Sequence, residues 1–448
     1  MKIGIDLTPL QSPHRMRGIG FTLMNLVNSI SAGEREKHSF VFFVVPRHET
    51  KFGDPLELLD LSNMDYEVRA SAPLKMIDEA SQKPPKQWAV PLLSVRYQRL
   101  AASLIRTIRG MMASYFGGSR DQNLDGIDVY LQPDQSQSLP RRHGLKKLLI
   151  IYDIIPYVLE RDYLISYNTA RLRHHSRKGS LHLQARRWLY AHKLRVSVKN
   201  SDCSIAISEH TKTDFVRYLH APAKKIRVVP LGVTPSDEAA APKPVTYRYV
   251  NTSWGYIKRP FKIDNSTPFI LFVGGADRRR RLEDLVTAFN HLRAEGHEFK
   301  LVLAGDSMQG PDNIATEEIR HALHDSSYLD DIIFLGFIDS ATRDWLYRKA
   351  MAFVYPSRYE GFGLPILEAM IHGAPVVTYK NSSIEEVAGP LPIYAHDSEG
   401  LRKAIGKLLS SKPEEIQHIR DKGILHAQKF SWQETSKKVF SIINSYDR

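Results

Sequence analysis

Short apolar runs alternate with segments of helical spacing along most of the chain. Runs this apolar are typical of strands buried on both faces, so the first half predicts a parallel sheet. The runs are IGIDL (3–7), FVFFVV (40–45), DVYLQ (128–132), KLLIIYD (147–153), CSIAIS (203–208) and VVPLG (228–232). After the first run, RGIG (17–20) predicts a glycine loop and FTLMNLVNSI (21–30) an amphipathic helix.

The same pattern begins again near residue 269. Helical segments at 282–292, 316–325 and 343–351 separate the new apolar runs. These runs are FILFVGG (269–275), KLVLAG (300–305), IIFLG (332–336), AFVYPS (352–357) and APVVTY (374–379). Strand and helix alternating twice over predict two doubly wound α/β domains, whose ligands bind beyond the carboxyl ends of the strands.

The length of 448 residues also favours two domains. We assign 1–233 to the first and 269–429 to the second, and we interpret 234–268 as the connection between them. No apolar run is long enough to span a membrane, the N-terminus lacks the pattern of a signal peptide, and the single cysteine, Cys203, excludes an internal disulfide. These features predict a cytoplasmic protein.

The net charge of +13 is concentrated in two stretches, 80–120 and 163–201, which contain basic residues and no Asp or Glu. In the first, apolar residues recur at helical spacing with arginines on the other side. A basic amphipathic helix can bind an anionic membrane, so we consider peripheral membrane contact through 88–120 and 171–199. The alternative is that the apolar stripe packs on the sheet and the arginines are solvated. The run RRRR (278–281) fits a phosphate site better than nucleic acid, which we do not expect as a partner.

The stretch SRYEGFGLPILEAMIHGAPVV (357–377) places Glu360 and Glu368 around a glycine turn that follows a predicted strand. Pro365 suits the first turn of a helix, so the turn exposes backbone N–H groups at a helix N-terminus, which bind anions. Carboxylates beside such a site are good acceptors for hydroxyl groups. A nucleotide sugar, with a diphosphate between ribose and hexose, has this arrangement. The alternative is two surface glutamates on an ordinary strand–helix turn.

This stretch resembles the signature of the retaining glycosyltransferases of family 4. The resemblance implies the GT-B fold, with two Rossmann-like doubly wound α/β domains facing across a cleft. It covers nearly the whole chain and keeps the family's order of motifs. The other segments are RGIGFTLMNLV (17–27), DIIPY (153–157), SDCSIAISEHTKTDFVRYL (201–219), VVPLGV (228–233), LFVGGADRRRRLEDLVTAF (271–289), LGFIDSATRDWLYRKAMAFVYPS (335–357), SIEEVAG (383–389) and FSW (430–432). The last implies that 430–448 is a helix that crosses back to the first domain.

Carried over residue by residue, the resemblance implies a donor site. Glu368 would hold the ribose hydroxyls and Glu360 the hexose, and Arg280 would take the place of the family's diphosphate-binding lysine. The implied donor-binding residues are Gly18, Gly20, Arg279, Arg280, Gly336, Phe337, Glu360, Gly361, Phe362, Gly363, Leu364 and Glu368. The catalytic candidates are Glu360, Arg280 and Asp153. Asp153 would be a polar group near the anomeric centre, and the alternative for it is a strand-end cap.

The chain departs from the family pattern at two places. Tyr152 precedes Asp153 where the family has histidine, which would alter the accepted sugar or acceptor, or weaken turnover. An arginine run, 279–281, stands where the family has Arg-Lys-Asn, and it keeps the positive charge. No Asp-x-Asp, HExxH or cysteine cluster occurs in the chain, so we expect neither a metal nor another cofactor. The arginines and a helix N-terminus would then stabilise the leaving diphosphate.

These features predict a retaining, metal-independent hexosyltransferase of bacterial surface polysaccharide synthesis. Its substrates would be a nucleotide diphosphate sugar and a glycan or polyprenyl-diphosphate-linked acceptor. Mannose from GDP-mannose is favoured, because the glycine loop and the strand-end motif look most like those of O-antigen mannosyltransferases. Two alternatives stay open: a non-catalytic nucleotide-sugar-binding subunit of a glycan synthase complex, and a basic nucleic-acid-binding or membrane-scaffold protein in which the glutamate turn has no role.

Overall fold

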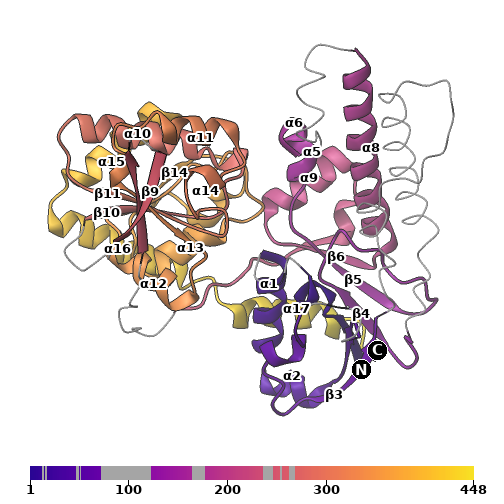
Figure 1. The fold of residues 1–448 in the computed structure, drawn as a ribbon. Coiled ribbons are helices and arrows are strands. Elements are labelled where there is room, and N and C mark those ends of the chain that lie inside the picture. Colours follow the sequence, from indigo (N-terminus) through magenta and orange to yellow (C-terminus); the bar gives the residue numbers. More distant parts are fainter. Residues whose placement is uncertain are drawn as a thin grey trace. The chain divides into compact units, whose positions relative to one another are not determined.

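The chain divides into two compact units, each built around one β-sheet with helices on its faces (Figure 1). The first unit comprises Met1–Ile207, Thr211–Val229 and Trp432–Arg448, and the second Ser208–His210 and Pro230–Ser431. The computed structural model describes residues 1–12, 15, 18–46, 50, 52–71, 123–163, 177–235, 246–252, 255–261 and 268–447.

The sheet of the first unit has the strand order β3-β2-β1-β4-β5-β6-β7, and all neighbouring strands are parallel. Five of the predicted apolar runs form strands of this sheet, whereas the sixth, 228–232, overlaps β7 only at Val228. The mostly exposed edge strand β3 escaped prediction because its sequence, DYEVRA, is polar. The strands are β1 (Lys2–Asp6), β2 (Ser39–Val44), β3 (Asp65–Ala70), β4 (Val129–Gln132), β5 (Lys146–Ile151), β6 (Cys203–Ala206) and β7 (Ile226–Val228).

Helices cover this sheet and include the end of the chain. They are α1 (Gly18–Asn28), α2 (Ala32–Lys37), α5 (Ile155–Val158), α6 (Glu160–Tyr163), α8 (Arg177–Asn200), α9 (Glu209–Leu219) and α17 (Trp432–Asn444). Helix α17 lies beside α1, where Trp432 packs edge-on against Phe21 with ring centroids 6.1 Å apart (Figure 1). The C-terminal helix is thus part of the first unit.

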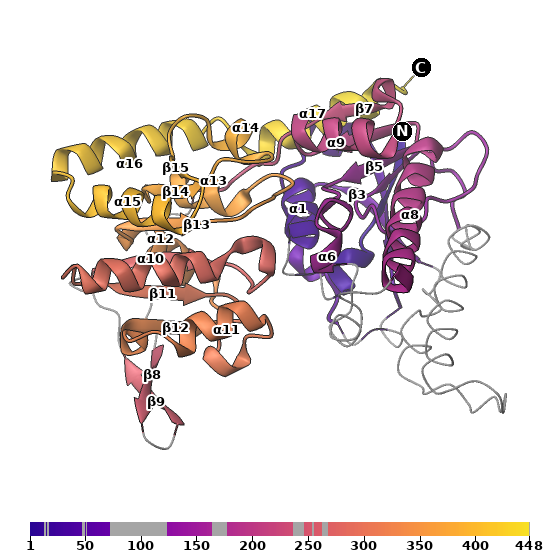
Figure 2. The same ribbon diagram turned by 90° about the horizontal axis from the view of Figure 1, so that it is seen from above.

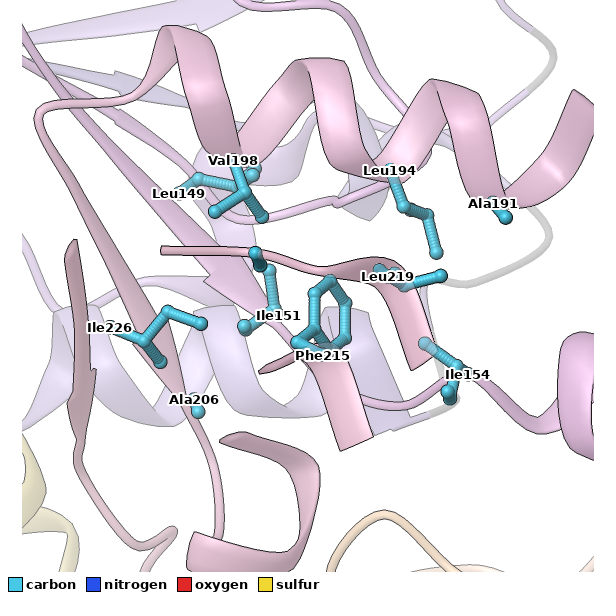
Figure 3. Close-up of a cluster of buried hydrophobic side chains, with 11 residues drawn as sticks. Leu149, Ile151, Ile154, Ala191, Leu194, Val198, Ala206, Phe215, Leu219 and Ile226 are labelled. Atoms are coloured by element: carbon cyan, nitrogen blue, oxygen red, sulfur yellow. The ribbon is translucent and has the colours of Figure 1, made fainter. Parts of the chain in front are cut away.

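A cluster of apolar side chains fills the space between β5 and the helices α8 and α9 (Figure 3). On α8, Ala191, Leu194 and Val198 recur at helical spacing and are buried. Each large aliphatic or aromatic side chain buried in this way contributes about 1.5–3 kcal/mol. The buried members are Leu149, Ile151, Ile154, Ala191, Leu194, Val198, Ala206, Phe215, Leu219, Ala221 and Ile226.

The sheet of the second unit has the order β15-β14-β13-β10-β11-β12-β8-β9. Its parallel strands are β10 (Phe269–Val273), β11 (Lys300–Ala304), β12 (Ile332–Gly336), β13 (Ala352–Tyr355), β14 (Val376–Tyr379) and β15 (Ile393–Ala395). The helices are α10 (Leu282–Ala294), α11 (Glu317–His324), α12 (Ser340–Lys349), α13 (Leu364–Ile371), α14 (Ile384–Ala388), α15 (Ser398–Leu409) and α16 (Pro413–Ala427).

The segment 234–268, which we expected to connect the domains, contributes instead to this second sheet. Strands β8 (Thr246–Thr252) and β9 (Gly255–Phe261) form an antiparallel hairpin, and β8 pairs antiparallel with β12 (Figure 2). Strand β12 pairs with β11 on one side only, so the backbone N–H and C=O groups on its other edge would lack partners. Strand β8 of the hairpin pairs with that edge.

The strand order of the second sheet reverses between β10 and β13. Strands β11 and β12 follow on one side of β10, and β13, β14 and β15 on the other. Loops that leave the carboxyl ends of β10 and β13 therefore part in opposite directions, which is where doubly wound sheets bind ligands. Residues 274–281 and 356–363, which follow these two strands, contain the predicted arginines and glutamate loop.

The predicted membrane surface is described only in part. Segment 88–120 lies outside the described residues. On α8, Arg187 pairs with Glu160 at 2.9 Å, and Arg195 Nε donates to the Leu219 carbonyl at 2.6 Å, so these two cations are bonded within the protein. Among the described residues, no helix has the length and apolar character needed to cross a bilayer.

The close backbone contact between the ends of β10 and β11 predicts that a side chain at Gly305 destabilises the second unit. Gly305, after β11, has a φ of +142°, and a Cβ there would lie 2.1 Å from the Gly274 carbonyl oxygen. We expect Gly305→Ala to lower the free energy of unfolding by about 2–3 kcal/mol, because two backbones would have to separate. Urea denaturation measures this. In Gly33→Ala, where no atom lies within 4 Å, stability should be unchanged or slightly higher. Equal stabilities of the two variants would contradict the packing.

Candidate functional site

Glu360 lies in the loop between β13 and α13, and its carboxylate is buried among polar partners from two strand ends. Its Oε1 accepts hydrogen bonds from Tyr355 Oη at 2.8 Å and Ser357 Oγ at 2.9 Å, and it pairs with Arg279 Nη1. Arg280 Nε lies 3.9 Å from the same oxygen. The carboxylate is therefore compensated by two arginines that follow β10.

The backbone of Glu360 is fixed as well. Its N–H donates to Ser382 Oγ at 2.9 Å, and its carbonyl accepts from Ser383 Oγ at 2.8 Å. Burial by itself would raise the pKa of the carboxyl, but Arg279 and Arg280, with the two hydroxyl donors, hold that pKa below its usual value of 4.5. Glu360 is thus ionised at neutral pH and fixed in place.

The two neighbouring arginines have different environments. Arg279 Nη1 also donates to the Tyr359 carbonyl at 3.0 Å, so this side chain ties the loop to the end of β10. Arg280 Nη1 donates to the Gly275 carbonyl at 3.2 Å and lies 3.7 Å from Asp277. Among the described residues, its buried Nε has no hydrogen-bond partner. Within this part of the chain, Arg280 thus has one N–H group without a hydrogen-bond partner, directed toward the buried side of the site near Glu360.

The glycine turn leads directly into α13, as the sequence predicted. Gly363 has a φ of +105°, a left-handed conformation that glycine adopts without strain, and it precedes the first helical residue, Leu364. Pro365 occupies the first turn, and no side chain in the described part of the protein caps this end. The helix N-terminus beside Glu360 is suited to an anionic group.

Glu368 lies one turn into α13 and is also buried. Its Oε1 is 3.2 Å from Arg343 Nη1 of α12, and its Oε2 is 3.5 Å from the Tyr347 hydroxyl. Each glutamate of the motif therefore has its own arginine. Sequence analysis did not identify Arg343 as a site residue. The only feature of the sequence that could have indicated it is its position in the predicted helix directly before the glutamate motif.

The strand ends next to β10 bring glycines together near the site. Gly305 N–H donates to the Gly336 carbonyl at 2.8 Å, and Gly336, at a φ of +65°, is the last residue of β12. Phe337 is 64% exposed, unusual for a phenylalanine, and lies directly after Gly336. An exposed ring at this strand end can pack against a planar group.

The remaining predicted residues belong to the first unit. Gly18 and Gly20 lie in the first turn of α1 and not in a glycine loop, because the helix begins earlier than its apolar spacing suggested. Asp153 Oδ1 accepts from the Ile155 N–H at 2.9 Å, the turn expected of a strand-end cap. Tyr152 is buried, and burial together with Asp134 raises the pKa of its phenol far above its usual value.

The described residues contain no group of His, Cys, Asp and Glu side chains arranged to hold a metal ion. The residues brought together in the second unit are instead carboxylates, arginines and a helix N-terminus. Such a set offers acceptors for hydroxyl groups and donors for phosphate groups.

Residues 256–426 match the family model "Glycosyl transferases group 1". The matched segment contains Arg279, Arg280, Arg343 and both glutamates, and it supports a glycosyltransferase of group 1.

Among curated proteins, the chain is 27% identical over 259 residues to the O-antigen chain mannosyltransferase B of Escherichia coli, covering 56% of this chain and 62% of that protein. It is 23% identical over 448 residues to the serotype-specific mannosyltransferase WbdA of Escherichia coli, covering 97% of this chain and 47% of WbdA. The chain thus spans less than two thirds of the length of either relative.

The solved structure of a sucrose-phosphate synthase from Thermosynechococcus elongatus is similar in fold. It has a TM-score of 0.60 and 17% identity, covering 99% of this chain and 98% of that one. This likeness and the two doubly wound sheets confirm the predicted α/β, GT-B fold class.

The buried ion pair predicts a strong dependence of stability on Arg279. Arg279→Met should lower the free energy of unfolding by about 3–5 kcal/mol, because the Glu360 carboxylate loses its direct counter-ion in a buried place. Glu360→Gln in the same background should recover most of this loss, as measured by urea denaturation in a double-mutant cycle. Additive losses in the double variant would show that the two residues do not form a pair.

The lowered pKa of Glu360 predicts a pH dependence with a defined sign. A carboxyl group whose pKa is lower in the folded protein stabilises it above the unfolded pKa, and this stabilisation is lost as the pH falls through the folded pKa. The stability difference between the parent and Glu360→Gln should therefore be largest above about pH 5.5 and shrink in more acidic solution. Denaturation across this range measures it, with the exposed Glu298→Gln as control. A constant difference would be inconsistent with the shift.

Proposed function

We propose that this chain is a retaining glycosyltransferase that moves a hexose from a nucleotide diphosphate sugar to a glycan or lipid-linked acceptor in bacterial surface polysaccharide synthesis. Mannose is the favoured sugar, since two relatives are an O-antigen chain mannosyltransferase and a serotype-specific mannosyltransferase. The similarity covers only part of those proteins. The donor and acceptor classes proposed for this chain are therefore argued from the residues of its own site.

One observation carries the proposal: an ionised, buried glutamate lies beside a partly unpaired arginine and an uncapped helix N-terminus at the switch point of a doubly wound sheet. The helix N-terminus and Arg280 suit a diphosphate, and Glu360 suits the hydroxyl groups of a sugar joined to it. Glu368, one turn further along α13, suits the hydroxyl groups of the ribose on the other side.

In the proposed reaction, the bond between the anomeric carbon and the diphosphate oxygen breaks. The acceptor oxygen bonds to the same face of that carbon, and its proton passes to the leaving phosphate. Negative charge grows on the diphosphate during this step. Arg280 and the amides of Phe362, Gly363 and Leu364 would stabilise it without a metal or other cofactor, because preorganised donors at the site of developing charge lower the barrier.

The other predicted residues take supporting roles in the proposal. Gly336 and Phe337 lie at the end of β12 and suit the nucleobase, by close backbone approach and ring packing. Gly18 and Gly20 belong to the first turn of α1, where amides are also directed outward. Asp153 would lie near the anomeric centre.

A non-catalytic nucleotide-sugar-binding subunit is the second candidate, favoured by Tyr152. This tyrosine occupies the place of the family's histidine, and burial with Asp134 nearby raises the pKa of its phenol far above neutrality. It therefore stays neutral where a histidine could take up a proton. Such a subunit would bind the donor and show no turnover.

The test is binding and hydrolysis of GDP-mannose, UDP-glucose, UDP-GlcNAc and dTDP-rhamnose by the parent, Glu360→Gln and Arg280→Met. We expect one donor to bind the parent and to be slowly hydrolysed, with turnover lowered about 10²-fold or more in each variant. Lys349→Met, a charge removed from an exposed position of α12, should behave as the parent. Binding without turnover, even with lipid-linked acceptors present, would favour the non-catalytic subunit. No binding of any donor would refute both candidates.

A further inference from the structure

Helices α12 and α13 share a buried network of charged side chains around Glu368. Beyond its 3.2 Å contact with Glu368 Oε1, Arg343 contacts Asp344 Oδ1 through both Nε and Nη2, each at 3.0 Å. This two-point contact fixes the plane of the guanidinium. The Asp344 side chain is almost completely buried, so the clamp on Arg343 is shielded from water.

The same network returns to the main chain of Glu368. Asp344 Oδ2 lies 3.6 Å from His372 Nε2, and His372 Nδ1 donates to the Glu368 carbonyl oxygen at 2.7 Å. The ring of Tyr347 stacks on His372, with centroids 6.0 Å apart and planes 15° apart. The carboxylate of Glu368 is thus contacted by residues of α12, and its carbonyl oxygen by His372 at the end of α13, a side chain that itself lies against Asp344 and Tyr347 of α12.

The contacts on the two carboxylate oxygens are unequal. Arg343 approaches Oε1 closely, whereas the Tyr347 hydroxyl is 3.5 Å from Oε2, at the limit of a hydrogen bond. The carboxylate therefore has a fixed orientation and keeps acceptor capacity for a ligand. Two oxygens in one fixed plane match two hydroxyl groups on neighbouring carbons, as in ribose.

We propose that Arg343, clamped by Asp344, is a positioning residue that orients Glu368 to accept hydrogen bonds from both hydroxyl groups of the donor ribose. The inference rests on the proposed function, since it concerns the ribose end of the same donor. Arg343 itself does not touch the donor. It acts through Glu368, and its loss leaves a carboxylate free to turn away.

The test compares ribose with deoxyribose. Calorimetric titrations would use GDP and 2′-deoxy-GDP, and UDP and 2′-deoxy-UDP, with the parent, Arg343→Met, Arg343→Lys and Lys349→Met. We expect the parent to bind its ribonucleotide about tenfold more tightly than the deoxy form, the difference expected for one hydrogen bond to a charged group. Arg343→Met should bind both forms with the weaker affinity. Arg343→Lys should recover part of the preference, and Lys349→Met all of it.

The ratio of affinities separates positioning from a general structural role. A loosened fold would weaken both nucleotides and keep their ratio, which would overturn the proposal. Tighter binding by Arg343→Met would also overturn it, because Arg343 would then be a competitor for the ribose. If Glu368→Gln loses the preference and Arg343→Met keeps it, the inference fails and the proposed function stands. If the parent binds none of the four nucleotides but binds dTDP, which lacks the 2′-hydroxyl group, the inference fails and the proposed function stands. If it binds none of these nucleotides, both fail.

Discussion

The candidate site depends on the compensation of one buried charge. A carboxylate removed from water is costly unless it is paired and hydrogen-bonded, and Glu360 has both kinds of partner. Its arginine comes from the end of β10 and its hydroxyl donors from the end of β13, so the charge can be buried only when these strands are neighbours. The buried charge of Glu360 is therefore stable only in a sheet in which β10 lies next to β13.

The ends of β10, β11 and β12 approach one another closely because glycines occupy them. Gly274 and Gly305 touch through backbone atoms, and Gly336 accepts a hydrogen bond from Gly305. Three successive strand ends can converge in this way because no Cβ separates them. Arg280 uses the space over Gly274, where a Cβ would lie 2.7 Å from its Nη1. The glycines thus decide where the arginine can lie.

The apolar runs predicted most of both sheets, because a strand buried on two faces leaves little room for polar residues. The same reasoning missed β3 and the β8–β9 hairpin, whose sequences are rich in polar residues and tyrosine, and the three-residue strand β15. Spacing located Glu360 and Glu368, but it could not show their counter-ions. Arg279 is 81 positions from Glu360, and Arg343 is on a different helix from Glu368, so only the fold brings these pairs together.

Two carboxylates beside a helix N-terminus would repel an anion from it if their charges were not compensated. Here Arg279 offsets Glu360 and Arg343 offsets Glu368, each from an element outside the glycine turn. Arg280 and the N-terminus of α13 then remain as the positive groups between two acceptors. In the proposed function, such an arrangement would let one short turn bind hydroxyl groups at its two sides and an anion at its centre. This proposed role of the glutamates depends on two arginines that come from other elements of the fold, Arg279 from the loop after β10 and Arg343 from α12.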